Sequence, residues 1–184
     1  TNWVQLFIGW ELVGFCSYAL IGHWYERPQA AEAGKKAFMV NRVADVGFLL
    51  GIVALWAHSS PIASDRTLDF ALLEHRLPHL LEIGWLSHDV LGLIGMLIFC
   101  GVLGKSAQMP LHVWLPDAME GPTPVSALIH AATMVAAGVY MLCRTFWLFE
   151  DLPSVLTVIA WTGGATALLT ACLALVEQDL KRIL

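Results

Sequence analysis

Five stretches of mostly apolar residues alternate with shorter polar segments along the chain. A membrane-spanning helix needs about 20 such residues, because it rises about 1.5 Å per residue across a hydrocarbon core of about 30 Å. The pattern predicts five spans, at residues 3–24, 37–57, 90–118, 125–148 and 155–176. Lipid-exposed segments must satisfy their backbone hydrogen bonds internally. The expected fold class is therefore all-α, a polytopic transmembrane helical bundle, with residues 1–184 forming a single transmembrane domain.

The third span is too long and too rich in proline to be one straight helix. Residues 90–118 would extend roughly 43 Å as a continuous helix. Pro110 and Pro116 lie within it, and proline removes a helical hydrogen bond and clashes with the preceding turn. We therefore expect a discontinuous helix, interrupted near residues 108–111. Irregular backbone at membrane depth is tolerated only inside protein or beside a wet cavity.

The longest connection, residues 58–89, contains several histidines. His75 and His79 have the i, i+4 spacing of two ligands on one helical face, but Pro78 lies between them and argues against a helix. We expect a solvated loop here and no metal site.

The composition supports the membrane class and excludes several others. The 184 residues are 58% apolar and only 14% charged, with a mean hydropathy of +0.68. Soluble domains average about 45–50% apolar residues and about 25% charged residues. The net charge of −5 argues against a nucleic-acid surface. The four cysteines are isolated and have no metal-ligand or redox spacing. The chain does not begin with Met, and it ends partway through the pattern of polar and apolar positions. We therefore expect a fragment of a longer protein.

A few ionisable residues lie inside the predicted spans, where charge is expensive. A charge near the bilayer centre costs about 2.5–3.5 kcal/mol on insertion scales, so such residues usually face the bundle interior and mark an ion or proton pathway. The candidate pathway residues are Glu11, Arg42, Asp45, Lys105, His112 and His130.

Each candidate also has a purely structural interpretation. Lys105 follows the apolar part of the third span and can gain or lose a proton when buried, but it can also extend to the interface. Arg42 and Asp45 are spaced i, i+3 and could form a simple ion pair, although Asp45 is also a possible partner for a lysine elsewhere. Glu11 could be a neutral, hydrogen-bonded acid that holds helices together.

The two histidines are weaker candidates than these charged residues. An imidazole titrates near neutral pH and can relay protons, but a lone histidine is more often a satisfied core residue. For His130, the acids and bases in the neighbouring spans favour a functional role. For His112, beside Pro110, the structural interpretation is favoured.

Four segments resemble the antiporter-like subunits of respiratory complex I, the NADH:quinone oxidoreductases. They are residues 6–14 (LFIGWELVG), 36–47 (KAFMVNRVADVG), 104–118 (GKSAQMPLHVWLPDA) and 119–135 (MEGPTPVSALIHAATMV). The last segment favours the subunit L branch of that family. The resemblance covers nearly the whole chain apart from residues 58–89.

The resemblance implies a fold of two inverted five-helix repeats, each with a broken helix. This chain would hold the last four helices of the first repeat and the first helix of the second. The resemblance further implies that Glu11 and Lys105 pair at the centre of a half-channel. His130 would be a relay toward the second half, and Arg42 and Asp45 would be the charged residues of the next helix.

The function implied is proton translocation driven by redox chemistry in other subunits. No Rossmann fingerprint, iron–sulfur spacing or haem motif occurs in the sequence, so no cofactor is expected in this chain. Quinone and NADH would be bound by other subunits. The implied partners are other membrane subunits of complex I and the lipid bilayer, with no nucleic acid. The implied location is an energy-transducing membrane, either a bacterial inner membrane or that of an organelle.

Three alternatives remain open from the sequence. The first is a large subunit of a multisubunit Na⁺/H⁺ antiporter, which shares these motifs. The second is a membrane module that couples proton flow to inorganic-carbon uptake. The third is a scaffold whose buried charges only hold helices together.

Overall fold

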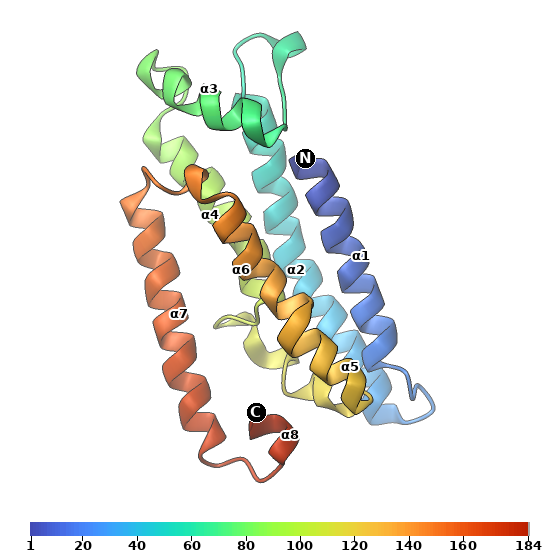
Figure 1. The fold of residues 1–184 in the computed structure, drawn as a ribbon. Helices are drawn as coiled ribbons and strands as arrows, with labels where there is room; N and C mark the ends of the chain where they lie inside the picture. Colours follow the sequence, from blue (N-terminus) through green and yellow to red (C-terminus); the bar gives the residue numbers. More distant parts are fainter. Residues whose placement is uncertain (184) are drawn as a thin grey trace.

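The computed structural model describes residues 1–183, which form a helical bundle with one helix lying across its end (Figure 1). Five helical segments are long and apolar enough to cross a membrane: α1 (Trp3–Ile21), α2 (Pro28–His58), α4 (His88–Lys105), Thr123–Arg144 and α7 (Pro153–Ala174). The shorter elements are η1 (Ala63–Asp65), α3 (Phe70–Glu82), η2 (Leu111–Trp114), η3 (Asp117–Glu120), η5 (Phe146–Leu148) and α8 (Leu180–Ile183). The all-α bundle predicted from the hydrophobic pattern is thus confirmed.

The fourth span consists of three consecutive pieces. They are α5 (Thr123–Ala127), a π-helical turn η4 (Leu128–Ala132) and α6 (Met134–Arg144). The amide of Thr133 donates to the carbonyl oxygen of Leu128 at 3.0 Å, five residues earlier. Such π turns occur frequently at functional sites, and this one contains His130.

Several boundaries differ from those predicted. The second span begins at Pro28 rather than near residue 37, because proline suits the first turn of a helix and Ala30, Ala33 and Gly34 are buried. The first span ends at Ile21 rather than near residue 24.

Residues 70–82 were expected to be a solvated loop, and that prediction was wrong. They form α3, which contains Pro78 in its last turns. The Asp69 carboxylate caps its start by accepting from the amides of Ala71 and Leu72 at 3.1 and 3.3 Å. Pro78 removes one hydrogen bond, but the buried side chains of one face outweigh that loss: Phe70, Leu73, Leu77 and Leu80.

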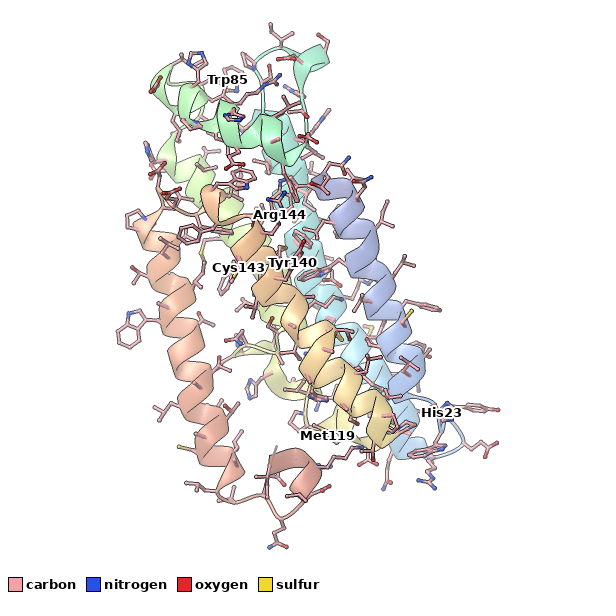
Figure 2. All side chains as sticks on the ribbon, in the orientation of Figure 1. His23, Trp85, Met119, Tyr140, Cys143 and Arg144 are labelled. Atoms are coloured by element: carbon pink, nitrogen blue, oxygen red, sulfur yellow. The ribbon has the colours of Figure 1, made fainter. Side chains whose placement is uncertain are left out.

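This amphipathic helix covers the end of the bundle near the N-terminus. The ring of Phe70 meets that of Trp3 edge to face, with centroids 5.1 Å apart. The guanidinium of Arg144, at the end of α6, lies 5.4 Å from the Phe70 ring (Figure 2). α3 therefore connects α1 and α6 across one face of the membrane domain.

Helices α2 and α4 pack closely because glycines line their interface. A methyl group on Gly51 would lie 2.9 Å from the backbone nitrogen of Ile98, and one on Gly104 would lie 2.5 Å from the Cβ of Ala44. Real side chains do not approach so closely, so only glycine allows this helix separation. The close approach brings Lys105, at the end of α4, against α2.

The third span is discontinuous, as predicted, but its second part differs from the expectation. α4 ends at Lys105, and Ala107 has a positive φ of 48°. The next elements are the two 3₁₀ turns η2 and η3 rather than a second α-helical half. Other elements bind the interrupted backbone: the Trp114 indole N–H donates to the Gly104 carbonyl oxygen at 3.0 Å, and the amide of Met109 donates to Thr166 Oγ1 at 2.9 Å.

Candidate functional site

A buried ion pair lies at the point where α4 is interrupted. Lys105 Nζ donates to Asp45 Oδ2 at 3.1 Å, and the two side chains are 1% and 3% exposed. Asp45 Oδ1 accepts a second hydrogen bond, from Trp10 Nε1 at 2.8 Å. A buried ion pair persists only when further hydrogen bonds satisfy its remaining atoms, and the indole provides one of them.

A second ion pair lies next to the first. Arg42 pairs with Glu11, whose side chain is 20% exposed, and the Arg42 guanidinium also covers the ring of Phe38 at 4.8 Å. Arg42 is one helical turn from Asp45 on α2, and Glu11 follows Trp10 on α1. The two pairs are therefore neighbours along the contact between these helices.

The pairing implied by the resemblance was wrong in this structure. Glu11 pairs with Arg42, and Lys105 pairs with Asp45. The simple ion pair between Arg42 and Asp45 is also not formed, because these two side chains are bound by α1 and α4 instead. The possibility that Asp45 is the partner of a lysine elsewhere is confirmed.

Two residues of this cluster were not singled out from the sequence. The ring of Trp10 lies 5.8 Å from Lys105 Nζ. A Cβ on Gly14 would lie only 2.7 Å from the same nitrogen, so the ammonium group occupies the space left by this glycine. Trp10 is distinctive in the sequence, since tryptophans favour the ends of membrane spans and this one lies in the middle of its span, beside Glu11.

A cavity of about 270 Å³ opens beside Lys105 between α1 and α6. Lys105, Gln5 and Tyr140 are among its lining residues, and its surface is mostly apolar. Tyr140 is on α6, near the middle of the bundle (Figure 2). Lys105 is therefore buried but lies at the edge of an open space between α1 and α6.

His130 lies away from this cluster. It lines a different cavity, of about 510 Å³, together with residues of η3, α7 and the C-terminal segment. Its Nε2 is buried and has no hydrogen-bond partner among residues 1–183, and the same holds for Nδ1 of His112. Within this described part of the chain, no direct hydrogen bond joins either histidine to Lys105, Asp45 or Glu11.

The cluster brings one amine, one guanidinium and two carboxylates together between α1, α2 and α4. Asp45 binds the Lys105 amine, and Glu11 provides the second carboxylate one helical turn from Gly14. The described residues contain no group of three or more His, Cys, Asp and Glu side chains arranged to hold a metal ion.

A buried ion pair between membrane helices, beside an interrupted helix, defines a polytopic membrane protein with charged groups inside its helical bundle. The chain belongs to the NADH:quinone oxidoreductase/Mrp antiporter transmembrane family, which matches residues 1–184.

Relatives support the same assignment. The chain is 53% identical over 182 residues to the NAD(P)H-quinone oxidoreductase chain 5 of Picosynechococcus sp. and 54% identical to that of Synechocystis sp., covering 98% of this chain and 26% of each relative. It is 52% identical to the chloroplastic NAD(P)H-quinone oxidoreductase subunit 5 of Marchantia polymorpha, covering 98% of this chain and 25% of that protein. The chain thus spans about a quarter of the length of these relatives. The resemblance to complex I antiporter-like subunits is confirmed.

A solved structure agrees with the fold. The Mrp complex from Dietzia sp. matches with a TM-score of 0.85 and 29% identity, covering 99% of this chain and 19% of the matched chain. The helical bundle is therefore shared with a chain of this Mrp complex.

Proposed function

We propose that this chain is part of a proton-translocating membrane subunit of an NAD(P)H:quinone oxidoreductase. The redox chemistry, and the binding of nicotinamide nucleotide and quinone, belong to other subunits. The partners of the full-length protein are the other membrane subunits of that complex and the lipid bilayer. Relatives from cyanobacteria and chloroplasts support a location in an energy-transducing membrane.

The observation that carries the proposal is the buried Lys105–Asp45 pair at the interrupted end of α4. Two fully buried charges are a poor way to stabilise a bundle, since apolar residues of similar volume are often as good or better. Their position beside a break in the helix and a cavity favours a proton-transfer role over a scaffold.

The proposed mechanism starts with the ammonium form of Lys105 bound to Asp45. If the carboxylate moves away, an uncompensated buried charge remains, which costs several kcal/mol. Lys105 then releases a proton from Nζ, and His130 receives it through intervening water. When a carboxylate, Asp45 or Glu11, returns to the amine, Lys105 takes up a new proton. His112, on the interrupted segment, is a second imidazole for this route.

The test uses the full-length protein in its assembled complex, reconstituted into liposomes. Lys105→Ala and Glu11→Gln are each expected to lower proton uptake per electron at least severalfold, since each removes a charge of the cluster. Lys35→Ala is the matched control, because Lys35 is an exposed lysine that pairs with Glu32 on the same helix. Undiminished pumping by the Lys105→Ala variant would contradict the proposal.

A second candidate function is that of a large Mrp-type antiporter subunit, which the match to the Dietzia complex supports. The higher identity to oxidoreductase subunits favours the first proposal. Purification of the full-length protein with its native partners distinguishes the two functions. Redox subunits in the preparation favour the oxidoreductase, and a set of membrane proteins without them favours the antiporter.

A further inference from the structure

We propose that Trp10 is a positioning residue that orients the Asp45 carboxylate toward Lys105. This inference rests on the proposed proton-transfer role of Lys105. It concerns the indole N–H, which makes a hydrogen bond between α1 and α2 inside the bundle.

The two oxygens of the Asp45 carboxylate have different partners. Oδ1 accepts from the Trp10 indole at 2.8 Å, and Oδ2 accepts from Lys105 at 3.1 Å. With the side chain 3% exposed, water contributes little. The indole N–H therefore holds Oδ1 in place and leaves Oδ2 directed at Lys105.

The indole has little freedom to move. Trp10 is 4% exposed, and its ring packs edge to face on Phe48, with centroids 5.2 Å apart at 64°. Phe48 is one helical turn beyond Asp45 on α2, so the same helix that carries the acceptor also holds the donor ring. This rigidity fixes the direction of the N–H toward Oδ1.

A second carboxylate, that of Glu11, lies near Lys105. Glu11 follows Trp10 on α1, and its Oε1 is buried without a hydrogen-bond partner among the described residues. One oxygen of Glu11 is thus free to accept from an ammonium group. The indole hydrogen bond favours Asp45 over Glu11 as the partner of Lys105, because it holds the Asp45 carboxylate and does not contact that of Glu11.

The test replaces the donor and keeps the ring. Benzothienylalanine at position 10 has nearly the shape of tryptophan but lacks the N–H, and Trp10→Phe is the simpler variant. The control is Trp161→Phe, since Trp161 is 75% exposed on α7. Pumping per electron is measured with the full-length protein in its complex.

Without the N–H, Oδ1 of Asp45 loses its fixed partner, and the carboxylate is free to turn away from Lys105. Pumping by the benzothienylalanine variant should therefore fall severalfold while the complex still assembles. The control should pump like the unmodified protein.

Two results would overturn the inference. One is normal pumping by the benzothienylalanine variant while Trp10→Phe is impaired, which indicates a packing role only, and the other is normal pumping by both variants. A variant Trp10→Phe that fails to assemble leaves the benzothienylalanine result decisive. Normal pumping by Lys105→Ala would instead contradict the proposed function itself, so the two failures are distinguishable.

Discussion

At the scale of single residues, a glycine determines where the ammonium group of Lys105 lies. Gly14 faces the end of the lysine side chain, and a Cβ in its place would come within 2.7 Å of Nζ. Gly9, on the same helix, has no atom within 4 Å of the equivalent position. Two glycines of one helix thus have different roles, one making space for a charge and the other not.

The variant Gly14→Ala should displace Lys105 from Asp45 while leaving the helix intact, because alanine is a better helix former than glycine. We expect pumping to fall severalfold, with near-normal assembly of the complex. Gly9→Ala is the control and should pump like the unmodified protein. Equal pumping by both variants would show that the position of the ammonium group is not sensitive to this contact.

At the scale of elements, the contact between α2 and α4 brings the charged residues together. Its glycines face backbone or rigid side-chain atoms of the opposite helix, as Gly51 faces the backbone nitrogen of Ile98. Backbone cannot rotate aside as a side-chain end can. A larger residue must therefore separate the helices and with them the ion pair.

We expect Gly51→Ala to destabilise the full-length protein by about 1–3 kcal/mol, the usual cost of overpacking. The measurement is the thermal unfolding midpoint in detergent. Gly92→Ala is the control, because a Cβ there meets no atom within 4 Å and the substitution should be neutral or slightly stabilising. A midpoint for Gly51→Ala equal to that of the control would contradict the close packing described.

At the scale of the whole molecule, the Thr166 hydroxyl joins the interrupted segment to the last span. Thr166 accepts from the amide of Met109 at 2.9 Å and donates to the carbonyl oxygen of Thr162 at 2.7 Å. α7 is otherwise mostly exposed along its length. This hydrogen bond therefore links the break near the charged cluster to the outer part of the bundle.

The variant Thr166→Val keeps the volume of the side chain but removes the acceptor. The Met109 amide then loses its partner, at a cost of about 1–3 kcal/mol. Hydrogen exchange of a peptide covering residues 106–115 should become faster in the full-length protein. Thr162→Val, whose hydroxyl bonds only within α7, should leave that exchange unchanged, and an identical rate in both variants would refute the link.

Local pattern explains why some expectations were right and others wrong. The number of spans and the interruption of the third follow from hydrophobic length and proline, which act within one segment. α3 was missed because Pro78 and the polar histidines outweighed a short apolar stripe. That stripe, from Phe70 to Leu80, stabilises a helix only because it is buried against the end of the bundle.

The sequence by itself determined the class of the protein, the spans and the small set of ionisable residues inside them. These depend on the cost of placing each residue type in hydrocarbon, which is a property of the residue and its near neighbours. The tertiary structure alone decided which charges pair. Partner choice depends on how far each helix is rotated and how closely it approaches the next. Those quantities are set by Gly14, Gly51 and Gly104 and by the indole of Trp10, which place Lys105 against Asp45 and leave Glu11 to Arg42.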